Sequence, residues 1–287
     1  MAEIRIPVFT TGQQLAAIRD EVDAAIERVL ASGWFILGRE VAAFEEEFAA
    51  YCGVDYAVGV ANGTDAIELA LRAVGTGPGD EVITVAHTAP FTGLAILATG
   101  ATPVFVDVDE DTMLLDATLI EAALSPKTRA ILPVHLYGRA ADVDAIAAVA
   151  RAAGVPVVVD AAQAHGASVA GDRAAALGDV AAFSFYPTKN LGAYGDGGAL
   201  VTDDPEIAER VRQLRSGGMA AEYCSDLPGR NSRLDELQAA VLRVKLPLLE
   251  TWNERRREIA ARYGAELRTV RIPEGNAGHA RHLYAVR

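Results

Sequence analysis

From residue 55 onward, short apolar runs alternate with longer segments in which apolar residues recur every three or four positions. The short runs are rich in β-branched residues and indicate strands, whereas the spacing of the longer segments indicates amphipathic helices. The expected strands read YAVGV, EVITVA, TPVFVDV, AILPVHL, VPVVVD, AAFSF and GALVT. Most are apolar on both faces, which is typical of a parallel sheet covered by helices. The pattern therefore predicts an α/β fold built on a mostly parallel sheet.

The helices expected between these strands read TDAIELALRAVG, FTGLAILATG, LIEAALS and ADVDAIAAVARAAG. Residues 235–267 predict a further long helix, which Pro247 should interrupt because proline lacks the N–H that a helix interior requires. The stretch after it, RTVRIPEGNAGHARHLYAVR, predicts one turn and a strand. We therefore expect a large domain over residues 1–245, and a connecting helix with the start of a small C-terminal domain over residues 246–287. The first residues of the chain could also contribute to the small domain.

The charge balance of this 287-residue chain is acidic, since Lys and Arg total 26, Asp and Glu total 39, and the formal net charge is -13. Such a chain repels phosphate backbones and anionic membrane surfaces, so we expect neither nucleic acid nor membrane as a partner. Cys52 and Cys224 form no CxxC pair, which argues against a disulfide framework or a thiolate metal site and favours a reducing compartment. The amino terminus lacks the pattern of a signal peptide, and no window is apolar enough for a membrane span. We expect a cytoplasmic protein.

Polar residues follow several of the expected strands, at the edge of the sheet where ligands bind in open α/β folds. They are Gly63, Thr64, Asp160, Gln163, His165, Ser184 and Lys189. Gly63 and Thr64 begin a helix, whose free N–H groups and dipole can seat a phosphate, although Thr64 could equally be a plain helix cap. His165 alone is a thin case for a metal site, and a lone histidine is more often structural.

Asp160 ends an apolar run, and a buried carboxylate is costly unless a cation or strong donors meet it. Its partner could be an arginine or a helix N-terminus, a metal ion, or the protonated ring nitrogen of a cofactor. Lys189 narrows the choice, because a lysine in a partly desolvated site has a lowered pKa and can attack carbonyl groups. A buried aspartate, a lysine after the next strand and a phosphate seat are together what pyridoxal phosphate requires. We expect no metal.

Long stretches of the chain resemble the DegT/StrS family of pyridoxal phosphate-dependent sugar aminotransferases, which have the fold type I scaffold. The most specific matches are DAAQAHGA, FSFYPTKN and NSRLDE. The resemblance implies that Lys189 is the Schiff-base lysine, that Asp160 pairs with the pyridine nitrogen and that Gln163 binds the ring hydroxyl. The residues that match the phosphate site are Gly63, Thr64 and Ser184.

Asn231, in GRNSRLDE, matches an asparagine that the family donates to the phosphate from the opposite subunit, which implies a homodimer with shared active sites. On the residues alone, Asn231 or Ser232 is a candidate helix cap, and that role is compatible with the family role. The family often places an aromatic ring over the cofactor where this chain has Ala89. His87 is the candidate for stacking on the ring instead, with Phe91 as the alternative.

The activity that the resemblance implies is a ping-pong transamination through Lys189, from an amino acid, glutamate or glutamine, to a nucleotide-linked keto-deoxyhexose. Two alternatives stay open. Family members continue beyond the motif matching HLYAVR, so the small domain is expected to be incomplete and the chain could be a non-catalytic or regulatory homologue. The second alternative is a deoxysugar dehydratase of the same fold, but dehydratases of this family carry a histidine where this chain has Lys189. A nucleotide-binding dehydrogenase is disfavoured because no GxGxxG follows the first strand.

Overall fold

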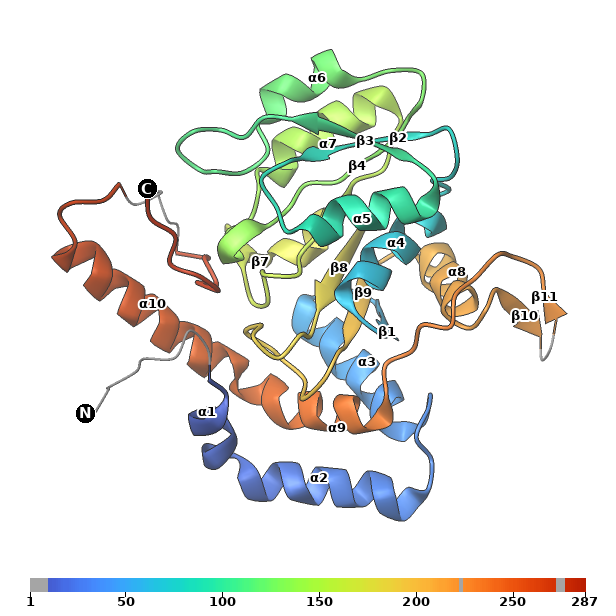
Figure 1. Ribbon diagram of the computed structural model, residues 1–287, viewed down its shortest axis with the longest axis vertical. Coiled ribbons are helices and arrows are strands. Elements are labelled where there is room, and N and C mark those ends of the chain that lie inside the picture. Colours follow the sequence, from blue (N-terminus) through green and yellow to red (C-terminus); the bar gives the residue numbers. More distant parts are fainter. Residues whose placement is uncertain (1–9, 222–223, 272–276) are drawn as a thin grey trace, which may run out of the picture.

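The centre of the molecule is a sheet, seen in a computed structural model that describes residues 10–221, 224–271 and 277–287 (Figure 1). A four-stranded part has the order β1-β9-β8-β5 and a three-stranded part has the order β3-β2-β4. Parallel bridges from Ile131 to Val157 and from Val134 to Asp160 join the two parts between β4 and β5. The strands are β1 (Tyr56–Val60), β2 (Glu81–Val85), β3 (Thr102–Val106), β4 (Thr128–Ile131), β5 (Val158–Asp160), β8 (Val180–Ser184) and β9 (Gly198–Thr202).

The sheet is mostly parallel, as the apolar runs predict. Strand β2 pairs in parallel with β3 and β4, and β5 pairs in parallel with β8. Strand β9 runs antiparallel to both of its neighbours, β1 and β8. The parallel strands β5 and β8 therefore end on the same edge of the sheet, at Asp160 and Ser184 respectively.

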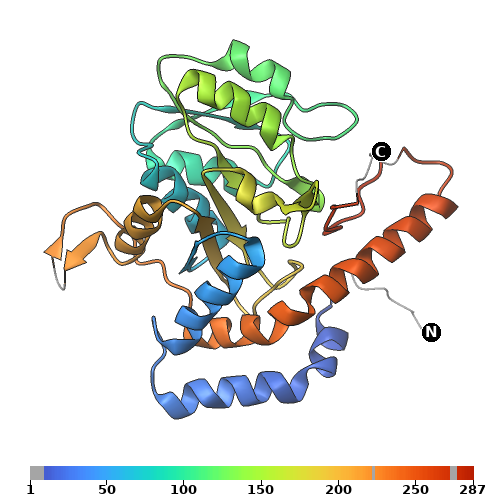
Figure 2. The same ribbon diagram turned by 180° about the vertical axis from the view of Figure 1, so that it is seen from behind.

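Helices cover both faces of the sheet. Figure 1 shows α4 and α5 in front of the strands, and the reverse view in Figure 2 shows α3 and α7 in front. The helices that follow strands are α4 (Gly63–Ala73), α5 (Pro90–Thr99), α6 (Ile120–Ala123), α7 (Val143–Ala153) and α8 (Pro205–Arg215). Short 3-10 turns are η1 (Ala117–Leu119), η2 (Leu136–Gly138) and η3 (Ala174–Leu177), and two small hairpins pair β6 (Ser168–Val169) with β7 (Asp172–Arg173) and β10 (Met219–Ala221) with β11 (Cys224–Ser225). The α/β fold expected from the sequence is confirmed.

The long helix expected over residues 235–267 is interrupted near Pro247, as predicted. It is divided into α9 (Glu236–Lys245), the 3-10 turn η4 (Leu246–Leu248) and α10 (Leu249–Glu266). The division between the two expected domains falls at this turn and stays a prediction. None of the described helices has the length and apolar character needed to cross a membrane.

Two expectations need correction. The run AILPVHL forms a regular ladder only to Ile131, because Pro133 has no N–H to donate and residues 131–135 meet β5 through separate bonds and bridges. The strand expected in RTVRIPEGNAGHARHLYAVR is absent from the described residues of that stretch, 268–271 and 277–287, although Arg271 and Arg287 exchange backbone hydrogen bonds of 2.7 and 2.8 Å. Part of the stretch that precedes HLYAVR, residues 272–276, lies outside the described residues.

Three helices precede the alternating strands and helices that begin near residue 55. They are α1 (Gly12–Ala17), α2 (Arg19–Ser32) and α3 (Arg39–Cys52). Helix α2 packs on α9, where Val22 meets Val241 in a small apolar cluster. Helix α3 begins against the buried carboxylate of Glu236, which accepts hydrogen bonds from the N–H groups of Gly38, Glu40 and Val41 at 2.8 to 2.9 Å. These donors have no intrahelical acceptor, so Glu236 fixes the start of α3 to α9.

Replacing Glu236 with alanine should destabilise the fold, because one buried and two half-buried N–H groups at the start of α3 lose their acceptor. We expect Glu236→Ala to lower the free energy of unfolding by about 2 to 4 kcal/mol. Urea denaturation followed by circular dichroism at one protein concentration measures this. The control is Glu46→Ala, an exposed position on the same helix, which should change stability by no more than about 0.5 kcal/mol. Equal effects of the two variants would contradict this role of Glu236.

Candidate active site

The start of α4 presents free backbone donors at the edge of the sheet. Its N-cap is Asn62, not Thr64, and the Asn62 side chain accepts from the N–H of Asp65 at 2.8 Å. The carbonyl of Asn62 accepts from the N–H of Ala66 at 3.0 Å. Among the described residues, the N–H groups of Gly63 and Thr64 have no acceptor, as expected for the first positions of a helix. This end of the helix can therefore bind an anion.

Gly63 lets this helix end approach the carboxyl end of β8. A Cβ atom at Gly63 would lie only 2.5 Å from Cβ of Ser184 and 3.1 Å from its hydroxyl oxygen. Only a glycine fits this contact without a shift of the backbone. The Ser184 hydroxyl, which accepts from the N–H of Tyr186 at 3.3 Å, thus lies beside the first N–H groups of α4. The three residues expected to bind phosphate are brought together by this close packing.

Asp160 is buried, with 5% of its surface exposed, and its carboxylate meets only neutral donors at hydrogen-bond distance. The Thr92 hydroxyl donates to Oδ2 at 2.8 Å and the N–H of Ala162 donates to Oδ1 at 3.1 Å. Burial raises the pKa of Asp160, while these two donors and the nearby charge of Lys189 oppose the rise. Asp160 therefore has the environment of a carboxylate that a cation would stabilise.

Lys189 lies in the turn after β8, where its N–H donates to the carbonyl of Tyr186 at 2.8 Å. Burial lowers the pKa of Lys189, and the negative charge of Asp160 partly opposes that change. The two side chains thus influence each other at the same edge of the sheet, which is the arrangement expected from the sequence. A lysine with a lowered pKa has a larger neutral fraction near pH 8 and is a better nucleophile and base.

Gln163 and His87 meet through a residue that the sequence analysis did not identify, Tyr137. The backbone N–H of Tyr137 donates to Oε1 of Gln163 at 2.7 Å, which leaves the Gln163 amide nitrogen as the donor for a ligand. The Tyr137 hydroxyl lies 3.3 Å from Nε2 of His87, and the two rings meet edge to face. Tyr137 has a φ of 59°, which is unusual for a non-glycine residue. The other stacking candidate, Phe91, is 59% exposed in the first turn of α5.

Asn231 is exposed and, within the described part of the chain, forms no hydrogen bond with the other candidate residues, although the residues on either side anchor its loop. The preceding Arg230 forms a 2.8 Å ion pair with the buried Glu68 on α4, and the following Ser232 accepts from the N–H of Ala61 at 3.1 Å. The expectation that Asn231 or Ser232 caps a helix is wrong. Helix α9 begins only at Glu236, and its N-cap is Asp235, which makes no side-chain cap.

His165 is fully buried and packs against the rings of Phe183 and Phe185, with centroid distances of 5.2 and 5.8 Å. Neither of its ring nitrogens has a side-chain partner among the described residues. Burial lowers the pKa of His165 well below its ordinary value, and the charge of Lys189 lowers it further. His165 is therefore a neutral packing residue behind the site, and a metal role finds no support in this geometry.

Thr92 is the other site residue that the sequence analysis missed. It lies in the first turn of α5 and is buried, and its hydroxyl is within 2.8 Å of the Thr88 hydroxyl. Since Thr92 donates to Asp160, Thr88 is the donor within this pair. The signal in the sequence is the pair of threonines in HTAPFT, four positions apart and directly after β2.

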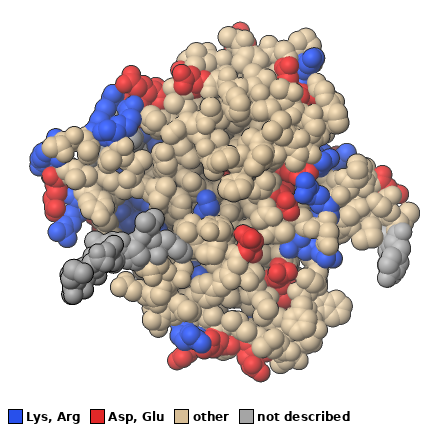
Figure 3. Space-filling view, viewed as in Figure 1, with Lys and Arg blue, Asp and Glu red and all other residues tan. Residues whose placement is uncertain are grey.

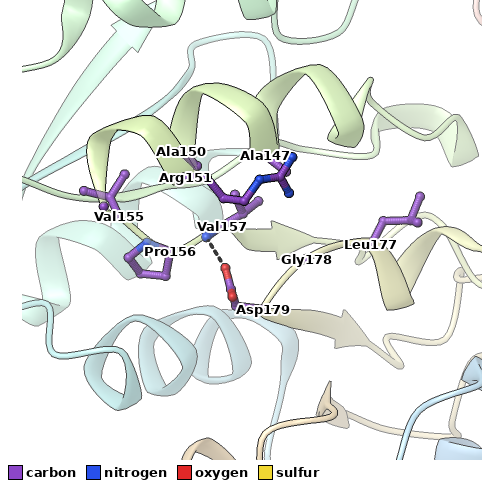
Figure 4. A pocket seen from close by; sticks show the side chains of 10 residues that line it. Ala147, Ala150, Arg151, Val155, Pro156, Val157, Leu177, Gly178 and Asp179 are labelled. Carbon is purple, nitrogen blue, oxygen red and sulfur yellow. Dashed lines mark hydrogen bonds between the residues drawn. The ribbon is translucent and has the colours of Figure 1, made fainter.

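These residues fit pyridoxal phosphate in the chemistry of their groups. The close approach of Gly63 to Ser184 gives a seat for a phosphate, and the buried carboxylate of Asp160, which has only neutral donors at hydrogen-bond distance, suits a protonated pyridine nitrogen as a further donor. A separate surface hollow of about 500 Å³, lined by Arg151 and Asp179 among others, opens at the amino ends of β5 and β8 (Figure 4). It lies at the opposite end of the strands, and its Asp179 carboxylate is bonded to the N–H of Val157 at 2.7 Å.

Gly63→Ala should weaken cofactor binding, because the new methyl group would separate the start of α4 from Ser184. We expect a loss of stability of about 1 to 3 kcal/mol and a lower affinity for pyridoxal phosphate. Fluorescence titration with the cofactor measures the affinity. The control is Gly77→Ala, where an added Cβ meets no atom within 4 Å, and which should bind as the wild type does. Wild-type affinity in Gly63→Ala would show that this approach does not form the phosphate seat.

Comparison with known proteins agrees with this geometry. The family model described as the DegT/DnrJ/EryC1/StrS aminotransferase family matches residues 16–287. A transaminase of Streptomyces venezuelae, named dTDP-3-amino-3,4,6-trideoxy-alpha-D-glucose transaminase, is 56% identical over 90% of this chain and 68% of its own length. The crystal structure of S. venezuelae DesV with a ketimine intermediate has a TM-score of 0.95 at 52% identity, covering 99% of this chain and 78% of that one.

A more distant structure contains a cofactor. NtdA from Bacillus subtilis with bound cofactor PMP has a TM-score of 0.93 at 32% identity, covering all of this chain and 67% of that one. The match of the family model to nearly the whole chain, together with the high identity to the Streptomyces enzyme, decides the assignment. The chain belongs to the DegT/DnrJ/EryC1/StrS aminotransferase family.

Proposed function

We propose that this aminotransferase uses pyridoxal phosphate and transfers an amino group from an amino acid, glutamate or glutamine, to a nucleotide-linked keto-deoxyhexose. The observation that carries the proposal is the placement of Asp160 and Lys189 on one edge of the sheet, each with the pKa shift that burial imposes. Bound pyridoxal phosphate supplies an aldehyde that condenses with amines and a ring that accepts the electron pair from a broken C–H bond.

Asp160 holds the proton on the ring nitrogen. Its burial makes an ionised carboxylate costly by itself, so a positive group at this position is favoured. The Thr92 hydroxyl and the Ala162 N–H each occupy one carboxylate oxygen and fix the plane of the carboxylate. Both bonds leave further lone pairs on the oxygens for a third donor.

Lys189 is the base that moves the proton at the α-carbon of the amino acid. The chain has only three lysines, and the other two are poorly placed for this role. Lys127 is exposed, and Nζ of the buried Lys245 donates to the carbonyl of Gly192 at 2.6 Å and lies 3.8 Å from the centre of the Tyr194 ring. Among the three, Lys189 alone follows the end of a strand on the edge that carries Asp160.

The remaining candidate residues would bind and orient the cofactor. Gly63, Thr64 and Ser184 offer donors to the phosphate, and the amide nitrogen of Gln163 can donate to the ring hydroxyl. His87 is held by Tyr137 beside Gln163, which suits a role next to the ring. These roles follow from the family resemblance and are supported by the packing just described.

The acceptor substrate is inferred from the relatives. The Streptomyces relative is named for a dTDP-linked amino sugar, which supports a nucleotide-linked keto-sugar as the acceptor here. The proposed transfer is ping-pong: the amino acid gives up its amino group and leaves as the 2-oxo acid before the keto-sugar enters the same site. A panel of dTDP- and UDP-linked keto-sugars, assayed for amino-sugar product, identifies the nucleotide and the carbon. A reducing cytosol remains the expected compartment.

We further propose a homodimer in which Asn231 of one subunit reaches the phosphate site of the other. Asn231 is exposed in the single chain, while the neighbouring Arg230 and Ser232 anchor its loop, so its side chain is presented outward from a fixed position. On the face shown in Figure 3, acidic and basic side chains are interspersed around wide uncharged areas.

Chemical mapping tests the lysine. After incubation with pyridoxal phosphate and reduction with borohydride, mass spectrometry of peptides should find the label on Lys189 alone. Lys189→Ala should lose the label and all transaminase activity, whereas Lys127→Ala should keep both. Label on Lys127 or Lys245 would contradict the assignment. Absorbance of the cofactor-bound protein that no amino donor changes would contradict the aminotransferase proposal.

The titration of Lys189 tests its pairing with Asp160. Reductive methylation with ¹³C-formaldehyde gives each of the three lysines an NMR signal, and exposed Lys127 serves as the internal reference. In the cofactor-free protein, Lys189 should titrate below the ordinary lysine value, because burial lowers its pKa. Asp160→Asn removes the charge that raises the pKa of Lys189, so the midpoint should move to still lower pH. An unchanged or higher midpoint in Asp160→Asn would contradict the pairing.

A further inference from the structure

The residue that follows the lysine, Asn190, is almost completely buried and uses both ends of its carboxamide. It is 1% exposed. Its amide nitrogen donates to Oδ1 of Asn253 and to the carbonyl of Ala280, each at 2.8 Å. Its Oδ1 lies 3.0 Å from Nδ1 of His282. Asn190 thus joins the lysine turn to helix α10 and to the C-terminal segment, residues 277–287.

The directions of these hydrogen bonds are fixed by the partners. The carbonyl of Ala280 can only accept, so the amide nitrogen of Asn190 faces it and the amide oxygen faces His282. His282 must therefore donate from Nδ1. Burial, together with the charges of Lys189 and Arg256, lowers the pKa of His282 to about 3. At neutral and alkaline pH, His282 is accordingly the neutral tautomer with its proton on Nδ1.

The C-terminal segment is in turn bonded to the loops that carry the cofactor-binding candidates. The N–H of Ala280 donates to the carbonyl of Gly138 at 2.8 Å, and the carbonyl of Gly278 accepts from the N–H of Ser168 at 2.9 Å. Gly138 has a φ of 93°, and a Cβ there would lie 2.9 Å from the backbone nitrogen of His282. Gly138 follows Tyr137, the residue that links His87 to Gln163.

Helix α10 is bonded to Asn190 through its residue Asn253. Asn253, which accepts from Asn190, donates from its own amide nitrogen to the carbonyl of His165 at 2.9 Å. Asn253 is fully buried, so each of its bonds replaces one to water and would be costly to lose. Asn190 therefore contacts α10 and the C-terminal segment directly, reaches the loop after β5 through Asn253, and is covalently joined to Lys189.

We propose that Asn190 is a positioning residue for Lys189, through which His282 and Asn253 hold the lysine turn in its water-poor place at the edge of the sheet. The inference deepens the proposed function and rests on the role given there to Lys189. In this proposal the C-terminal segment influences the position of the Lys189 amine through Asn190, and it does so without touching substrate or cofactor.

The physical reason lies in the buried polar groups. Removing one partner of Asn190 leaves a buried donor or acceptor unsatisfied, and the turn can restore the bond only by moving or by admitting water. Either change reduces the desolvation of the adjacent Lys189. The other charged or titratable groups around the lysine are Asp160, His165 and His282, and both histidines are neutral when the lysine titrates. Loss of His282 therefore removes no charge at alkaline pH.

The test is the ¹³C titration of Lys189 in the full-length, cofactor-free chain. We expect Asn190→Ala and His282→Ala to raise the midpoint of Lys189 toward the ordinary lysine value, opposite in sign to Asp160→Asn. His282→Asn should restore the wild-type midpoint, because its amide nitrogen can donate from the position of Nδ1. Leu283→Ala, an exposed position in the same segment, is the matched control and should not change the titration.

A second measurement follows the rate of reaction with pyridoxal phosphate at pH 8. Because each unit of higher pKa lowers the neutral fraction about tenfold, the rate should fall in His282→Ala and recover in His282→Asn. If His282→Ala folds, as circular dichroism would show, and keeps the wild-type Lys189 midpoint and the wild-type rate with pyridoxal phosphate, the proposal is overturned. This outcome decides the question even if Asn190→Ala fails to fold. The titration needs neither cofactor nor turnover, so it can succeed or fail independently of the proposed aminotransferase reaction.

Discussion

The attraction between Asp160 and Lys189, in a part of the molecule with little water, is the interaction on which the rest of the site depends. Burial by itself would favour the neutral form of each group, and it raises the pKa of Asp160 and lowers that of Lys189. Each charge opposes the shift of the other. The outcome is a carboxylate that is stabilised by a cation and an amine that loses its proton more easily than an exposed lysine, as aminotransferase chemistry requires.

The fold produces this arrangement through two kinds of contact. Parallel strands β5 and β8 end on the same edge, which places Asp160 near the turn that carries Lys189. Buried hydrogen bonds then fix the side chains, from Thr92 to Asp160 and from Asn253 and His282 to Asn190. These buried hydrogen bonds make the site sensitive to segments far away in the sequence, including α10 and the C-terminal residues, which contact no reacting group.

The sequence predicts the strands and most helices of the large domain because their apolar periodicity is local and strong. It does not show that β9 runs antiparallel, since both orientations bury the same residues. The helix cap at Asn62 was missed because Thr64 is an equally good capping residue two positions later. The interruption of AILPVHL at Pro133 could have been predicted from the missing N–H alone. The candidate residues Gly63 and Ser184 prove to be neighbours, which their positions after two separate strands already suggested.

The bonds of Asn190 could not be predicted from the sequence, because its side-chain partners lie 63 and 92 positions later in segments without a clear periodic pattern. The most direct test of the central claim is a crystal structure of the purified protein with pyridoxal phosphate. The account predicts the pyridine nitrogen within about 3 Å of an Asp160 carboxylate oxygen, and continuous density from the cofactor to the amine of Lys189. A cofactor joined to Lys245, or bound at the opposite end of the strands near Asp179, would contradict it.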